Sequence, residues 1–187
     1  MFAIGIKRLQ QHKKRRSESN TGSMRIFKLF VISIVLFAFL IVGLSALFPS
    51  NVRISRAINI GAPMQKVHLG LEDLHKWQYW NDMTTQEYLT NKNFSDSAFA
   101  SDQMKVQLVS ASPDLVLTSW NRNENEAIKS GFQLVAADDS TVVQWYFDFK
   151  LKWYPWEKFG SIIFDKQLGP AMESSLSRLK KFIENNQ

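Results

Sequence analysis

The longest hydrophobic run of the chain lies near its N-terminus, where residues 29–48 carry no charge over 20 positions. An α-helix of that length is about 30 Å long, which matches the hydrocarbon thickness of a bilayer. The strongest later candidate, residues 142–151, contains Asp148 and Lys150. The pattern therefore predicts one transmembrane helix over residues 29–48.

Two other interpretations of this run stay open. A cleavable signal peptide has a shorter apolar centre of about 7 to 15 residues before a small-residue site, which Gly43 and Ser45 match only in part. A buried core helix is the second alternative. The Lys and Arg residues clustered on one flank of the run are more typical of a membrane span.

Alternation of apolar and polar residues begins directly after the run and predicts a strand over residues 52–60 with one buried face. The alternating apolar positions are Val52, Ile54, Ile58 and Ile60. Arg56 falls in the same register, either as an edge residue or as a polar group directed into the fold. Pro63 ends the strand and can open a helix. We expect two short helices next, over residues 64–71 and 72–80.

From residue 85 onward, short alternating segments separated by turn residues predict an antiparallel meander. The expected strands are approximately 86–91, 94–100, 103–111, 115–121, 127–136 and 141–151. In the last of them, Val143, Trp145, Phe147 and Phe149 share one face. One side of the sheet is therefore expected to face a core and the other to face water.

After Pro155 the apolar period becomes helical, which predicts a long amphipathic helix at the C-terminus. Its apolar positions are Leu168, Met172, Leu176, Leu179 and Ile183. Pro170 follows Gly169 and lacks a backbone donor. We therefore expect one helix over about 157–168, a kink or break, and a second helix over 170–185.

These elements form an α+β arrangement in which an antiparallel sheet wraps around the terminal helix. Short motifs occur in a fixed order along it: Ala62-Pro63 with Val67, Asp73-Leu74 with Trp77 and Trp80, Thr141 with Val143 and Trp145, and Leu168-Gly169-Pro170 with Leu176 and Leu179-Lys180. By these motifs, residues 49–186 resemble the START-like superfamily, also called SRPBCC or polyketide cyclase/dehydrase and lipid-transport proteins, and within it the membrane-anchored bacterial members. His68 departs from the pattern, since such proteins usually carry an aromatic residue there. The resemblance implies a helix-grip fold in residues 49–187.

Positive charge is concentrated before the apolar run. Eight of the 23 Lys and Arg residues precede it with one of the 17 acidic residues, which leaves 15 bases and 16 acids in residues 49–187. A near-neutral domain argues against binding to nucleic acid.

The charge asymmetry predicts the topology. Residues 1–28 are expected to be a basic, disordered cytoplasmic arm, and residues 49–187 to lie outside, in the periplasm of a bacterium whose inner membrane the chain spans once. Translation from Met24 would leave only Arg25 and Lys28 on the inner side.

Catalytic and metal-binding patterns are weak in this sequence. The absence of cysteine excludes disulfides, thiolate ligands and cysteine nucleophiles. His68, Glu72 and His75 would share one face of a continuous helix, but a break expected near residues 70–73 removes that alignment, so we predict no metal. We also predict no cofactor, since the glycines are scattered and form no phosphate-binding loop.

Large apolar side chains supply the candidate site. The pocket candidates are Trp77, Trp80, Trp120, Phe132, Val143, Trp145, Phe147, Phe164, Leu168 and Met172. The resemblance implies a cavity between sheet and terminal helix, and apolar walls suit a lipid or another hydrophobic small molecule. The sequence leaves open whether these side chains line a cavity or fill it.

Three functions follow from these observations. The favoured one is a membrane-anchored, non-enzymatic domain that binds a hydrophobic ligand. A partner-binding envelope domain with a filled core is the first alternative. The second is an enzyme of the cyclase/dehydrase type, which would need an inward polar residue such as Arg56 or Ser130.

Overall fold

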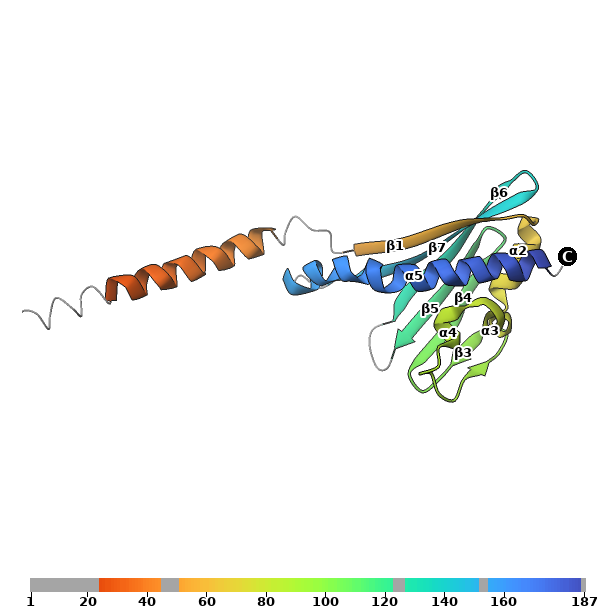
Figure 1. The fold of residues 1–187 in the computed structure, drawn as a ribbon, viewed down its shortest axis with the longest axis horizontal. Helices are drawn as coiled ribbons and strands as arrows, with labels where there is room; N and C mark the ends of the chain where they lie inside the picture. The colour runs from red at the N-terminus through yellow and green to blue at the C-terminus, as the bar shows by residue number, and fades with distance from the viewer. Residues whose placement is uncertain (1–23, 45–50, 123–126, 152–154, 186–187) are drawn as a thin grey trace, which may run out of the picture. The chain divides into compact units, whose positions relative to one another are not determined.

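A computed structural model describes residues 24–44, 51–122, 127–151 and 155–185, the side chains of 155–163 excepted. The chain divides into two compact units, Met1–Phe48 and Pro49–Gln187 (Figure 1).

The described part of the first unit is one apolar helix, Met24–Leu44, which contains an 18-residue window with a mean hydropathy of 2.8 and no side chain buried in protein. Its 21 residues are enough to cross a membrane, a criterion that a signal sequence also meets. The helix begins five residues before the predicted span, so residues 24–28 are helical and not part of a disordered arm. The rest of that arm, and residues 45–48 of the predicted span, lie outside the described residues.

Within the described residues, seven strands of the second unit form one antiparallel sheet in the order β1-β7-β6-β5-β4-β3-β2. The strands are β1 (Asn51–Ile60), β2 (Asn93–Phe94), β3 (Ala98–Ala100), β4 (Met104–Ser112), β5 (Leu115–Arg122), β6 (Ile128–Ala137) and β7 (Ser140–Lys150). The first strand pairs with the last, from Asn51 opposite Lys150 to Ile60 opposite Thr141. The fold class is therefore α+β, as the sequence predicts.

The helices of the second unit are α2 (Met64–Glu72), the 3-10 turn η1 (Leu74–Lys76), α3 (Trp77–Trp80), α4 (Asp82–Thr85) and α5 (Pro155–Asn185). Extended backbone at Asp73 ends α2, and the Asp73 carboxylate accepts a hydrogen bond of 3.0 Å from the His75 amide. Asn81 caps α4 in the same way, through the Met83 amide. The expected break near residues 70–73 is thus confirmed.

The C-terminal helix α5 lies along the inner face of the sheet and runs parallel to β1 (Figure 1). Alternate β7 residues, Thr141, Val143, Trp145 and Phe147, point into the core and are buried. The opposing α5 residues are Met172, Leu176, Leu179 and Ile183, all buried. Every described core residue lies between Ile54 and Ile183, so we expect the second unit to fold without residues 1–48.

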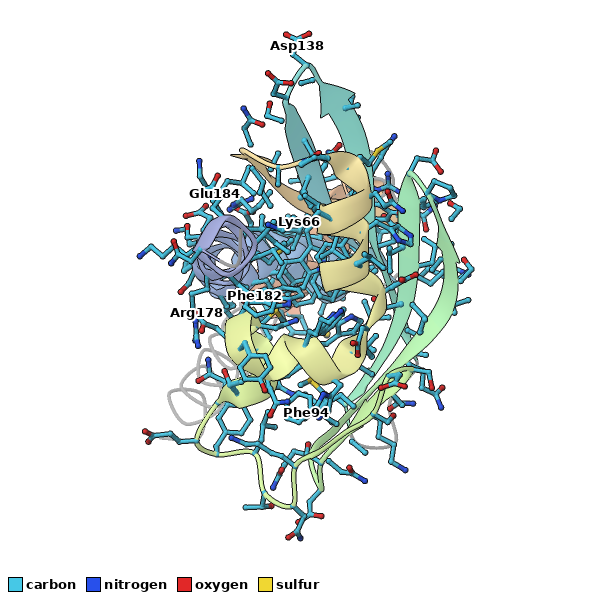
Figure 2. All side chains as sticks on the ribbon, turned by 90° about the vertical axis from the view of Figure 1, so that its right-hand side faces the viewer. Lys66, Phe94, Asp138, Arg178, Phe182 and Glu184 are labelled. Carbon is cyan, nitrogen blue, oxygen red and sulfur yellow. The ribbon has the colours of Figure 1, made fainter. Side chains whose placement is uncertain are left out.

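The two ends of the sheet hold different turns and strand termini. One end, called here the hairpin end, holds the β4–β5 and β6–β7 turns and lies beside α2; it faces the viewer in Figure 2, where Asp138 marks the tip of the β6–β7 turn. The opposite end, called here the open end, holds the start of β1, the end of β5, the start of β6 and the end of β7.

The predicted strand over residues 86–91 is wrong. Leu89 is buried as a single anchor. Its neighbour Thr90 bonds to side chains of Asp102 and Gln103 instead of to a strand. The predicted strand 94–100 is also interrupted, because Ser95 closes a turn with Ala98 between β2 and β3.

The predicted break at Pro170 is wrong as well, because α5 continues through it. Pro170 deprives the Lys166 carbonyl of its helical donor, but both residues are exposed, so water can bond to that carbonyl. Gly169 is buried beneath the guanidinium of Arg56, which crosses the helix at this point. Glycine is needed here because a Cβ would overlap that guanidinium.

Candidate functional site

The interior between the sheet and the helices is filled toward the hairpin end by a cluster of aromatic rings. Trp145 stacks on Phe132 with ring centroids 4.9 Å apart, and Trp80 meets both rings edge-on. Trp77 packs between Trp80 and Trp120. These side chains are at most 4% exposed, so this part of the interior holds no room for a ligand.

Three of the buried indoles donate hydrogen bonds within the core: Trp77 to the Leu71 carbonyl at 2.9 Å, Trp120 to Thr118 Oγ1 at 3.0 Å, and Trp145 to Ser130 Oγ at 2.8 Å. The Ser130 hydroxyl in turn donates to the Tyr146 carbonyl at 2.8 Å. Because Ser130 both accepts and donates inside the core, it serves to orient Trp145.

The interior opens at the other end into a cavity of about 510 Å³ between the sheet, α4 and α5. Its apolar walls include Trp120, Phe147, Phe149, Phe164, Leu168 and Ala171. This volume lies within the range of small-molecule sites, which are mostly apolar with a few polar groups.

Polar groups occur at defined places in this cavity. Arg122 donates a hydrogen bond of 2.7 Å to the Tyr88 hydroxyl, and both residues line the wall. Asn121 also borders the cavity, but its side-chain oxygen is buried, and the alternation of β5 places it on the face opposite Trp120.

The structure separates the ten predicted site residues into two groups. Four of them line the cavity: Trp120, Phe147, Phe164 and Leu168. The other six belong to the buried core: Trp77, Trp80, Phe132, Val143, Trp145 and Met172.

Phe149, which the sequence places on the inward face of the last strand, lines the cavity as well. The sequence does not identify several other cavity residues, among them Ala171, Asn121 and Arg122. One of these carries a usable signal, since Ala171 lies three residues after Leu168 on the same side of α5.

Arg56 connects β1 to α5 next to the cavity wall. Its guanidinium binds Asp165 at 2.9 Å and Glu173 at 2.6 Å, on either side of Gly169. Hydrogen bonds to Asp165 and Glu173 raise the pKa of Arg56 above its ordinary value. Arg56 therefore keeps its charge at every physiological pH and has no proton to exchange.

We expect Arg56→Met to lower the free energy of unfolding by about 1 kcal/mol or less, because both carboxylate partners are exposed and their ion pairs are screened by water. Binding of an apolar fluorescent ligand should stay unchanged, since Arg56 does not line the cavity. Urea unfolding and ligand titration of residues 49–187 measure the two effects. Glu173→Gln is the matched control, and loss of ligand binding in Arg56→Met alone would contradict this assignment.

The three residues of the possible metal cluster do not come together. His68 Nδ1 lies 3.4 Å from a Glu72 carboxylate oxygen within α2. His75 lies beyond the extended Asp73 and contacts Gln78 instead. Within the described residues, no three His, Asp or Glu side chains form a group that could hold a metal ion.

No protein-family profile and no curated protein matches this sequence. Solved structures do match it at low identity. A START superfamily protein from Mycobacterium smegmatis is 15% identical, with a TM-score of 0.53 over 72% of this chain and 99% of that one. A protein from Rhodobacter sphaeroides is 12% identical, with a TM-score of 0.56 over 72% and 93% of the two chains.

CalU16 from Micromonospora echinospora is 15% identical, with a TM-score of 0.50 over 70% of this chain and 73% of that one. Likeness at such identities concerns the fold. The second unit therefore has a START-like helix-grip fold, and the resemblance carried by the sequence motifs is confirmed at that level.

Proposed function

We propose that this protein is a membrane-anchored, non-enzymatic binding protein for a lipid or another hydrophobic small molecule. The cavity of about 510 Å³ at the open end of the sheet is the observation that carries the proposal. Its aromatic and aliphatic walls favour an apolar ligand, and the hydrogen-bonded side chains of Arg122 and Tyr88 provide polar groups at the wall.

The position of the reactive candidates supports binding over catalysis. Ser130 is committed to Trp145 and Tyr146 inside the core, and Arg56 is committed to two carboxylates outside the cavity. A cyclase or dehydrase would need a polar group that can move a proton at the cavity wall. Neither of the two candidates named for that role lines the cavity.

The apolar helix Met24–Leu44 supports the membrane anchor. Its N-terminal flank holds eight bases and one acid up to residue 28, which favours an inside N-terminus and a domain on the outer side of a bacterial inner membrane.

Detection of a ligand that stays bound through purification tests the binding function. Residues 49–187, purified without detergent, should carry an apolar molecule that organic extraction releases and mass spectrometry detects at a stoichiometry near one. The expected result has a physical basis, because an apolar cavity of this size is stabilised by an apolar occupant. No retained molecule, together with no binding of a fluorescent fatty acid, would favour the envelope domain with a filled core.

Protease access tests the anchor. In spheroplasts, external protease should digest a tag at the C-terminus and leave a tag at residue 1 intact, while the full chain stays in the membrane fraction. A soluble product that begins near residue 46 would show that the apolar helix is a signal sequence. A protected C-terminal tag would reverse the topology.

A further inference from the structure

The sheet has a second hollow at its open end, whose charged lining residues lie on the face turned away from α5. It encloses about 570 Å³ and its charged side chains are Arg53, Lys129, Asp148 and Lys150. Strand register places Asp148 between Arg53 on β1 and Lys129 on β6, with Lys150 opposite Asn51. We call these four residues and the space between them the basic hollow.

The described side chains of the basic hollow comprise three bases and one acid. Arg53 is held in place, because it binds both carboxylate oxygens of Asp148 at 2.7 and 2.8 Å and lies 4.0 Å from the centre of the Tyr146 ring. Lys129 and Lys150 are exposed and form no ion pair within the described residues. The hollow therefore offers two ammonium groups that no described carboxylate neutralises.

The turns at the opposite end of the sheet carry acids. The two hairpin turns hold Asp114, Asp138 and Asp139, all exposed. Among the described residues, the bases of the basic hollow and these acids therefore lie at opposite ends of the strands.

The basic hollow adjoins the proposed ligand cavity. Ile128 and Phe149 line both spaces. The covalent chain also limits how far this end can lie from the membrane span: Asn51 follows Leu44 by seven residues, which reach at most about 25 Å when fully extended. The tether, the cavity mouth and the basic charges therefore belong to one end of the domain.

We propose that the basic hollow docks on the anionic phospholipid headgroups of the membrane that anchors the chain, and so keeps the cavity mouth at the bilayer surface. Lys129 and Lys150 supply mobile point charges for phosphate groups, while Arg53 stays paired with Asp148. Such attraction acts only within about 10 Å of the surface, a distance that the short tether allows. This inference rests on the anchored binding function proposed above. It adds that the ligand enters the cavity from the bilayer surface.

The absence of cysteine permits a direct test on the full chain. A single cysteine in place of Gln107, which is exposed and lies in the same cross-strand row as Lys129, carries a fluorophore. A second label replaces Ala137 at the hairpin end. The chain is placed in nanodiscs that hold a headgroup-linked quencher, in phosphatidylcholine alone or mixed two to one with phosphatidylglycerol.

Quenching at position 107 should rise at least about twofold in the anionic discs, and quenching at position 137 should not. The double change Lys129→Gln and Lys150→Gln should return quenching to the level of neutral discs. The matched control, Lys66→Gln with Lys181→Gln, removes the same charge from α2 and the end of α5 and should keep the response. Equal quenching in both discs, or equal loss in both double variants, would overturn the docking surface.

Titration of a fluorescent fatty acid from solution, in the same samples, separates the two proposals. Binding of the fatty acid without any response to anionic lipid refutes the docking surface and leaves the binding function standing. A charge-dependent response without fatty-acid binding refutes the binding function and leaves the docking surface standing. If the hollow bound an acidic protein in place of lipid, adding that protein to neutral discs would change the quenching at position 107. That result would also overturn the proposal.

Discussion

Replacing Trp145 with alanine should lower the free energy of unfolding of residues 49–187 by about 3 to 5 kcal/mol. The side chain is fully buried and its ring lies within 7 Å of four other aromatic rings, those of Trp80, Trp120, Phe132 and Phe147. The substitution opens a void at this point, and the packed neighbours can close it only in part. Urea unfolding monitored by circular dichroism measures the change.

Two controls separate packing from hydrogen bonding at this position. Trp145→Phe keeps most of the ring but removes the donor to Ser130, so we expect a smaller loss, of about 1 to 3 kcal/mol. Val135→Ala, on the exposed outer face of β6, should change stability by about 0.5 kcal/mol or less. A Trp145→Ala protein as stable as the Val135→Ala protein would show that the aromatic cluster is not the core of the domain.

Replacing Ala171 with tryptophan should weaken binding of a fluorescent fatty acid at least about tenfold while changing stability by about 1 kcal/mol or less. Ala171 lines the cavity, so the indole enters space that is available to a ligand. Ligand titration and thermal unfolding of residues 49–187 measure the two effects together.

The adjacent residue provides the matched control. Met172 is fully buried in the core, so Met172→Trp overpacks its site and should cost about 1 to 3 kcal/mol. Ser177→Trp, exposed on the same helix, should alter neither property. Similar destabilisation by Ala171→Trp and Met172→Trp would mean that the interior is filled at both positions and that the cavity does not take a ligand.

Periodicity predicted which faces of the main elements are buried. The inward residues of β1 and β7 alternate without exception from Ile58 to Ile60 and from Thr141 to Phe147, and the apolar stripe of α5 contains Met172, Leu176 and Leu179. Such patterns are robust because strand and helix geometry alone decide which side chains share a face. The fold class follows from them.

The cavity was harder to predict, because it depends on which element packs against each part of a strand's inward face. Trp145 and Phe149 lie on the same side of β7, yet Trp145 is enclosed by Trp80 and Phe132 while Phe149 borders open space. The short helix α3 covers the first position and ends before it reaches the second. Strand periodicity holds no information about where such a covering element stops.

The errors in local structure have a similar origin. Four to six alternating residues, such as those around Leu89, are too few to distinguish a strand from a loop with one buried anchor. Pro170 indicates a helix break when taken alone, but α5 tolerates it where the affected carbonyl faces water. Both outcomes were decided by the environment of the segment.

The pairing of β1 with β7 also bears on how the protein folds. Arg53 and Asp148 are 95 residues apart in sequence, and the first strand has no other partner within the described sheet. Sheets built on such distant pairings have high contact order and fold slowly, in milliseconds to seconds. During synthesis β1 emerges first and must wait for about a hundred residues before its partner exists. Until then its edges are unpaired, so the nascent chain is open to wrong strand pairing during that interval.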